Sequence, residues 1–336
     1  MIQTKAVAFC VFALSTIAGC APGDEAGAQP SGDTESVVFP SDPPDGPMPE
    51  IGPVPEGYTP TAAGSPSTDI WMAALVRDGG TLSVPDLGRG TDRDGYDNQP
   101  SFLLDGSAIL HTSAVDRTQT EIMRLSAPGE SERVTQTSDV SEFSALQIPG
   151  QDAFSAIHEI RGKQYLWRYD LSGEPLGPIF ATAEPVGYHA WANEHVVAMF
   201  ILGNPPTLQV GDAITGEIGV VAERPGRSIH RIPGTEEISF VRKVSDEEWW
   251  IERFDPADGT AESERIARTL PGREDYAWTP EGEILMGDGS KLYAWSPSSD
   301  WSEIADFSAL GVAGITRLAV SPAGDRIAIV ANRPGG

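Results

Sequence analysis

Apolar and polar residues alternate in short runs over most of the chain, and no stretch keeps the 3.6-residue period of an amphipathic helix. The runs are rich in β-branched and aromatic side chains and end at Gly, Pro, Asp or Asn. This pattern predicts strands joined by tight turns, and therefore an all-β fold. The clearest predicted strands are residues 70–76, 107–113, 121–126, 195–202, 237–244, 291–296 and 326–331.

The predicted strands recur with a period close to 44 residues. A turn that follows an aromatic or branched residue appears six times, in steps of 44, 44, 40, 48 and 42 residues. Each copy continues with a second strand, an aromatic third strand, a turn and a fourth strand, which predicts a six-bladed β-propeller with four antiparallel strands per blade. The turns end at Gly106, Gly150, Glu194, Gly234, Gly282 and Gly324.

The sixth copy contains only two strands, and we expect the N-terminal strands to complete it. Residues 69–76 and 81–85 precede the first full copy and resemble an orphan third and fourth strand. From Asp69 to Asn332 there are 264 residues, or 44 for each of six blades. Pairing the two ends of this region would close the ring and hide the sheet edges.

Two segments resemble the PD40, or WD40-like, repeat of TolB-type propellers, with its core Pro-x-Phe/Trp-Ser-Pro-Asp-Gly-x-x-Ile/Leu-x-Phe. They are YDNQPSFLLDGSAILHTS at 96–113 and RLAVSPAGDRIAIV at 317–330, with a moderate match, YAWTPEGEIL, at 276–285. The resemblance covers about residues 69–332 and implies the propeller fold. It implies little about activity, because the repeat occurs in binding scaffolds, serine peptidases and lyases. TolB itself has an α/β domain before its propeller, so its partner contacts are not transferred.

Residues 1–19 are expected to be a lipoprotein signal peptide. A single positive charge at Lys5 precedes an apolar run over 6–17, which is shorter than the roughly 20 residues of a spanning helix. Ile17-Ala18-Gly19-Cys20 resembles the lipobox of bacterial lipoproteins, which implies cleavage before Cys20 and its lipidation. Ala21 then implies the outer membrane, with the protein facing the periplasm. The alternative is a secreted protein cleaved near Gly19.

Residues 20–67 are expected to be the lipidated Cys20 followed by a disordered tether, and 68–333 the propeller. Between 21 and 67 there are eleven prolines, eight acidic residues and no Lys or Arg. Such a segment buries too little apolar surface to offset its ordering entropy. The alternative is that 37–39 or 51–58 folds back against the propeller.

Charge narrows the possible partners. The chain has 49 acidic and 23 basic residues, a formal charge of -26, and after residue 67 there are still 41 acidic against 22 basic residues. Phosphate backbones need a basic surface, so nucleic acid is excluded as a partner, and anionic lipid surfaces are disfavoured. The usual serine-hydrolase, nucleotide, zinc and thiol motifs do not occur, and we expect no cofactor.

The first strands of a propeller surround its channel, so equivalent positions on them are the candidate site. Alignment on the turns gives Pro100, Ser144, His189, His230, Tyr276 and Leu318, with Asn98, Glu142, Tyr188, Arg231, Asp275 and Arg317 close by. We predict a ligand-binding set of Asn98, Tyr188, His189, His230, Arg231, Asp275, Tyr276 and Arg317.

The leading hypothesis is a non-enzymatic scaffold, anchored to the membrane through Cys20, that binds a protein, peptide or envelope polymer. The alternative is a hydrolase or lyase using His189, His230 and Glu142 or Asp275, because paired imidazoles and carboxylates can hold a metal or move protons. Three further histidines on or beside second strands are expected to serve packing or to lie at the surface: His111, His158 and His195.

Two weaker patterns have both a functional and a structural interpretation. Asp92, Asp94 and Asp97 alternate around a glycine, loosely like a calcium loop, but a polar connection between blades is the other use. Trp167 and Trp249-Trp250 could stack on carbohydrate, although aromatic third strands usually pack between blades.

Overall fold

The computed structural model describes residues 66–114, 119–258 and 262–333. The predicted signal peptide, Cys20 and almost all of the predicted tether lie outside these residues. Among the described residues, no helix has the length and apolarity needed to cross a membrane.

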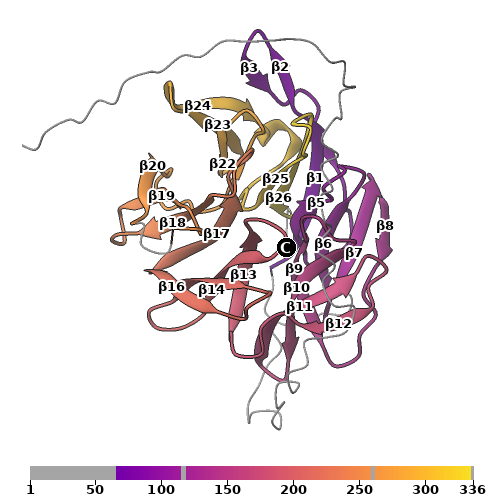
Figure 1. Ribbon diagram of the computed structural model, residues 1–336. Helices are drawn as coiled ribbons and strands as arrows, with labels where there is room; N and C mark the ends of the chain where they lie inside the picture. The colour runs from indigo at the N-terminus through magenta and orange to yellow at the C-terminus, as the bar shows by residue number, and fades with distance from the viewer. Residues whose placement is uncertain (1–65, 115–118, 259–261, 334–336) are drawn as a thin grey trace, which may run out of the picture. The chain divides into compact units, whose positions relative to one another are not determined.

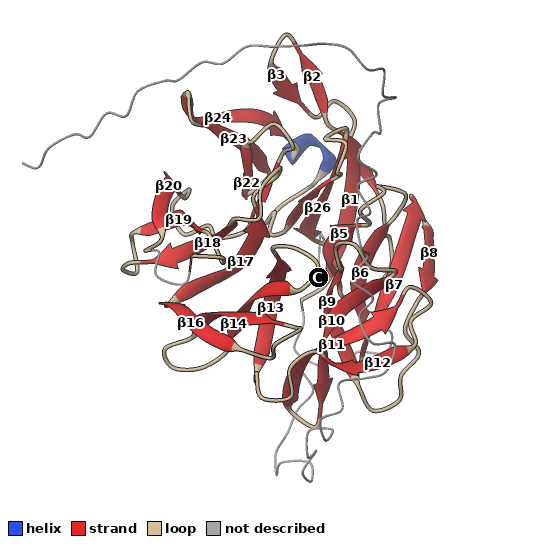
Figure 2. Ribbon diagram, in the orientation of Figure 1, coloured by secondary structure: helices blue, strands red, loops and turns tan. Residues whose placement is uncertain are grey.

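The described residues form six four-stranded antiparallel sheets, which confirms the six-bladed propeller. Figure 1 shows the sheets arranged around a centre, and Figure 2 shows that strands dominate, with one short helical turn, Ser308–Leu310. Five sheets follow chain order. They are β5(Asp97–Phe102) to β6(Ile109–Ala114), β7(Thr120–Ala127) and β8(Glu130–Arg133); β9(Ser141–Gln147) to β10(Ala153–Ile160), β11(Lys163–Asp170) and β12(Pro175–Pro178); β13(Val186–Trp191) to β14(Val196–Ile201), β15(Thr207–Asp212) and β16(Ile218–Glu223); β17(Pro225–Arg231) to β18(Ile238–Lys243), β19(Trp249–Phe254) and β20(Glu264–Arg268); and β21(Tyr276–Trp278) to β22(Ile284–Asp288), β23(Lys291–Ser296) and β24(Ser299–Asp306).

The sixth sheet joins both ends of the propeller, as predicted. β1(Thr68–Ala74) lies between β26(Arg326–Asn332) and β4(Gly88–Arg89), and β25(Leu318–Val320) is the inner strand. β1 pairs with β26 over seven residues, from Thr68 opposite Asn332 to Ala74 opposite Arg326. The indigo and yellow ends of the ribbon therefore lie side by side (Figure 1).

The predicted fourth strand of this sheet, residues 81–85, is wrong. Thr81–Ser83 is β3, and it pairs with β2(Val76–Asp78) in a separate hairpin, while β4 takes the fourth place. Gly79 and Gly80, both at positive φ, supply the two-residue turn that such a hairpin favours. Leu82 is buried in the apolar cluster of the last two sheets, so the hairpin packs against the ring.

Ion pairs connect the two ends of the propeller beside the closing sheet. They include Asp92 and Asp94, two residues of the calcium-like pattern. Asp69, with a side chain 1% exposed, lies 2.7 Å from Arg89 Nη1 and 3.2 Å from Arg333 Nη1. Arg333 also reaches Asp92 at 3.2 Å and Asp94 at 3.5 Å. These carboxylates pair with arginines from both ends of the propeller. The ion pairs favour the interpretation as a polar connection between blades.

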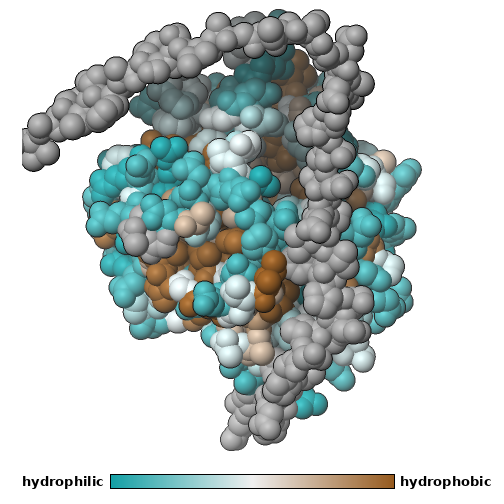
Figure 3. All heavy atoms as spheres, viewed as in Figure 1, coloured by the Kyte–Doolittle hydropathy of each residue, from teal (hydrophilic) through white to brown (hydrophobic). Residues whose placement is uncertain are grey.

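Hydrophobic packing between neighbouring sheets forms the core. Successive side chains of a strand point to opposite faces of its sheet, so each sheet presents apolar side chains to both neighbouring sheets. One apolar cluster between two sheets contains Leu110 and Ile122 of the first and Phe154 and Tyr169 of the second. Hydrophilic residues cover much of the edge of the visible face, and hydrophobic residues gather toward its middle (Figure 3).

The tryptophans favour the packing interpretation over carbohydrate stacking. Trp167 is buried and stacks on His158 with ring centres 4.3 Å apart. Trp249 and Trp250 are half-buried, and the cations of Lys243 and Arg265 lie over their rings at 4.3 and 4.7 Å.

Candidate functional site

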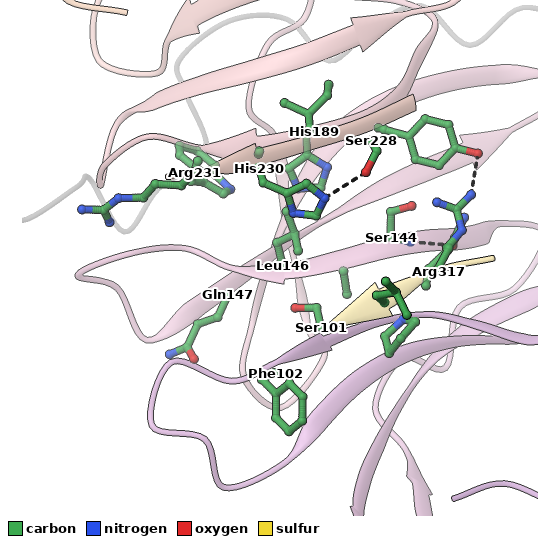
Figure 4. Close-up of a pocket in the computed structure, with 18 of the residues that line it drawn as sticks. Ser101, Phe102, Ser144, Leu146, Gln147, His189, Ser228, His230, Arg231 and Arg317 are labelled. Atoms are coloured by element: carbon green, nitrogen blue, oxygen red, sulfur yellow. Dashed lines mark hydrogen bonds between the residues drawn. The ribbon is translucent and has the colours of Figure 1, made fainter. Parts of the chain in front are cut away.

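All six inner strands, β5, β9, β13, β17, β21 and β25, line a cavity of about 290 Å³ at the centre of the propeller. The structure brings the six aligned positions together in this lining, as it does four of the neighbouring positions. The aligned positions are Pro100, Ser144, His189, His230, Tyr276 and Leu318, and the neighbours are Tyr188, Arg231, Asp275 and Arg317. Figure 4 shows Arg231 and Arg317 at opposite ends of this cavity.

Asn98 and Glu142 are not in the lining, and bulges in their strands explain why. Gln99 and Ser144 adopt positive φ values of 55° and 53°, and each strand there gains one residue relative to its partner. A bulge reverses the alternation of side chains beyond it. Asn98 Nδ2 therefore contacts Thr68 Oγ1 at 3.2 Å, and Glu142 contacts Thr137 Oγ1 at 2.5 Å between two sheets.

A charged layer forms one end of the cavity. Arg227 donates two hydrogen bonds to the carboxylate of Asp275, at 3.0 and 2.5 Å. Arg317 donates to the Tyr188 hydroxyl at 3.0 Å, lies over that ring, and is 3.8 Å from Asp275. Beyond Arg227, Glu274 pairs with Lys243 at 2.9 Å.

Tyr188 and Arg227 also line a second cavity of about 370 Å³, which extends toward Phe200 and Trp249. This second cavity includes the beginnings of β13 and β17, whereas the first extends to the ends of those strands. The charged layer therefore lies where the two cavities adjoin.

Both histidines of the lining are neutral at physiological pH. Burial lowers the pKa of His189 to about 3 and that of His230 to about 4. His189 Nε2 lies 2.7 Å from Ser155 Oγ. His230 Nε2 lies 2.9 Å from Ser228 Oγ (Figure 4). Neutral imidazole offers one donor and one acceptor, so His189, which uses only Nε2, can bind a polar ligand group through Nδ1 without adding charge.

Two buried polar atoms of the wall have no hydrogen-bond partner, His189 Nδ1 and Ser144 Oγ. Buried polar atoms are normally paired, so an exception at a cavity wall points to a ligand or to solvent. The backbone N–H of Ser144 is satisfied by Gln99 Oε1 at 3.0 Å. Ser144 is therefore held in its unusual conformation by the neighbouring inner strand.

The other predicted metal or histidine positions do not join this cavity. In residues 66–114, 119–258 and 262–333, no three His, Cys, Asp or Glu side chains are grouped so as to hold a metal ion. Asp97 accepts from Arg93 Nη2 at 2.8 Å and from Ser113 Oγ at 2.5 Å. His111 and His158 are buried in β6 and β10, and His195 precedes β14.

Sequence reasoning missed Gln99, Arg227 and Ser228, which also line the cavity. Ser228 lies two residues before His230 on β17, so strand alternation alone could have found it. Arg227 and Gln99 lie inside bulges, in the segments where the register shifts between Pro225 and Ile229 and between Asn98 and Ser101. Simple alternation does not identify such residues.

Comparison with known proteins identifies the fold but not the activity. Neither the family models nor the curated proteins give a match to this sequence. A structure assigned as TolB from Agrobacterium tumefaciens is similar at a TM-score of 0.62 and 16% identity, covering 81% of this chain and 100% of the other. TolB from Acinetobacter baumannii gives 0.51 and 11%, covering 78% and 64%. A chain of a nidogen/laminin complex gives 0.53 and 10%, covering 71% and 92%. The chain thus has the six-bladed fold of TolB-like propellers.

Proposed function

We propose that this chain is a lipid-anchored, periplasm-facing propeller that binds a protein, peptide or envelope polymer at the mouth of its channel. The observation that supports it is a cavity walled by all six sheets, two of whose lining residues, His189 and Ser144, each have a buried polar atom without a partner, Nδ1 and Oγ. The turn after β5 adds Leu104 to the lining, 50% exposed. The end of the cavity at Leu104 is called here its mouth. An exposed apolar side chain in the lining of a cavity that also has polar groups is a favourable combination for binding.

The binding test is crosslinked capture of partners by the full lipidated chain from its own envelope. Leu104→Asp should abolish capture of the specific partner because it places a charge at the mouth. Val220→Asp is the matched control, since Val220 is 64% exposed on β16, an outer strand. Equal capture by both variants would contradict a role for the cavity mouth.

The anchor has a separate test, because Cys20 lies outside the described residues. Cells expressing the full chain would be labelled with palmitate and fractionated. The native chain should carry the label and sediment with outer membranes, and Cys20→Ser should lose both properties. Labelling that survives Cys20→Ser would contradict the lipobox assignment.

A hydrolase or lyase is the second candidate, and the Ser228–His230 contact of 2.9 Å favours it. Its carboxylate would be Asp275, which lines the same cavity, because Glu142 does not. Neutral imidazoles can accept a proton from a substrate or from Ser228. Failure to capture any partner, together with cleavage of an envelope polymer or peptide that is lost in the double variant His189→Ala/His230→Ala, would favour this candidate.

A further inference from the structure

The charged side chains of the cavity wall are mostly cationic, although the chain is strongly acidic. Three arginines line the cavity, Arg227, Arg231 and Arg317, against one carboxylate among the described lining residues, Asp275. Over the whole sequence, acidic residues outnumber basic ones by 49 to 23. A cavity lined mainly by charges of one sign raises the local concentration of ligands of the opposite charge. The cationic wall therefore favours an anionic ligand group.

Arg317 is the arginine of the wall that is both largely buried, with a side chain 16% exposed, and left with donors for a ligand. Arg227 is bidentate on Asp275 and lies 3.6 Å from Glu274. Arg231 is exposed, and its guanidinium points away from the other labelled residues of the wall (Figure 4). Arg317 makes one short hydrogen bond, to Tyr188, and its ion pair with Asp275 is long at 3.8 Å. A guanidinium has five N–H donors in a planar fork that matches a carboxylate.

Apolar groups continue the wall from Arg317 toward the mouth. They include Leu318, Leu146, Ile229 and Trp191. The cavity volume of about 290 Å³ is at the lower limit of ordinary small-molecule sites, so one or two residues of a chain could enter and a folded domain could not.

We infer that the cavity binds a carboxylate joined to a short apolar group, and that the C-terminal end of a peptide supplies it. The carboxylate bonds to Arg317, the last side chain packs on Leu146 and Ile229, and the preceding amide lies in the part of the cavity lined by His189 and Ser144. This inference rests on the proposed function and names the part of the partner that enters the channel. A free apolar carboxylic acid offers the same chemistry.

The test is calorimetric titration of the full chain with the tripeptide Ala-Ala-Leu, its C-terminal amide, and 4-methylpentanoate. The acid peptide should bind at least about 10-fold more tightly than the amide, because hydrogen bonds to charged groups are the stronger ones. Arg317→Gln should weaken the acid peptide roughly 10- to 100-fold and leave the amide unchanged. Arg253→Gln, at an exposed arginine of β19, removes the same charge elsewhere and should change neither affinity.

Equal affinity for acid and amide would overturn the inference, and so would equal losses in Arg317→Gln and Arg253→Gln. Affinity for 4-methylpentanoate equal to that for the peptide would overturn the peptide source and assign a small acid. Thermal unfolding verifies that Arg317→Gln is folded, and Arg317→Lys should recover part of the affinity because it keeps the charge without the fork.

Failure here is distinguishable from failure of the scaffold proposal. If Leu104→Asp loses the captured partner and the native chain binds acid and amide peptides equally, the scaffold proposal stands and the carboxylate site is rejected. If the native chain binds the acid peptide more tightly than the amide but captures no partner, the carboxylate site stands and the scaffold proposal is rejected.

Discussion

Two buried polar clusters of this propeller use histidine and acidic residues in different settings: one lines the channel cavity, and the other lies between two sheets. The channel cavity holds His189, His230 and Asp275. The other cluster, called here the inter-blade network, lies between the β5–β8 sheet and the β9–β12 sheet. Burial lowers the pKa of a histidine to about 4 in each cluster, at His230 and at His158. The inter-blade network consists of Glu121, Thr135, Glu142, His158 and Tyr169.

The clusters differ in how their hydrogen bonds are satisfied. In the inter-blade network, Thr135 Oγ1 lies 2.8 Å from Glu121 and 3.3 Å from Glu142, and the Tyr169 hydroxyl lies 2.7 Å from His158 Nδ1. In the cavity, His189 Nδ1 and Ser144 Oγ have no partner. A shifted pKa therefore marks burial in both clusters, whereas cavity-lining residues with an unpaired polar atom mark the cluster suited to a ligand.

The largest expected effect is the replacement of Tyr169 by alanine. Tyr169 is fully buried, stacks on Phe154 at 5.1 Å between ring centres, and satisfies His158. Tyr169→Ala should lower the free energy of unfolding by about 3–5 kcal/mol, measured by urea unfolding. Tyr293→Ala, at a half-buried tyrosine of β23, is the control and should cost much less. A loss as small as the control's would contradict the structural role of the network.

The next effect depends on pH. Burial raises the pKa of Glu142 from its ordinary 4.5 to about 8, against hydrogen bonds from Thr137 and Thr135 that lower it, while the charge of Glu121 adds to the rise. The Thr135 hydroxyl has one proton and cannot donate to both carboxylates, which agrees with a protonated Glu142. Between pH 4.5 and 8 the unfolded chain loses this proton and the folded chain keeps it, so stability falls as pH rises.

Glu142→Gln isolates this effect because the amide cannot ionise. Between pH 5 and 8 the native chain should lose about 2–4 kcal/mol of unfolding free energy relative to the variant, from about 1.4 kcal/mol per pH unit. Urea unfolding at several pH values measures the difference, and subtraction removes the contributions of the buried histidines. Parallel profiles for the two proteins would show that Glu142 is ionised in the folded state.

The fold could be predicted from the sequence because each blade repeats the same local signals. Gly106, Gly150, Gly282 and Gly324 all adopt positive φ in their turns. The glycines and the repeat period therefore predict the same turn positions. Residues 81–85 could not be placed in the same way, because the Gly79–Gly80 turn makes a local hairpin from strands that the period assigns to the closing sheet.

The site could be predicted on the turn side of each inner strand, which in β5 and β9 is the part from the bulge to the turn. The aligned positions reached the lining because the position of each turn fixes the end of its inner strand. Asn98 and Glu142 were misplaced because of the bulges at Gln99 and Ser144, which depend on a hydrogen bond between sheets. Neither glutamine nor serine is a residue type that predicts a positive φ. Arg227 was missed for the same kind of reason.

The smallest expected effect comes from a matched pair of hydroxyl deletions, one in each cluster. Ser144→Ala removes a buried hydroxyl that has no partner, so the free energy of unfolding should change by less than about 0.5 kcal/mol. Thr135→Val keeps the shape but removes a hydroxyl that bonds to Glu121, Glu142 and the Ile122 N–H, so it should cost about 1–3 kcal/mol. For the acid peptide the order should reverse, with weaker binding to Ser144→Ala and native binding to Thr135→Val. Equal stability losses in the pair would mean that Ser144 is satisfied by solvent, and the contrast between an open and a closed cluster would then fail.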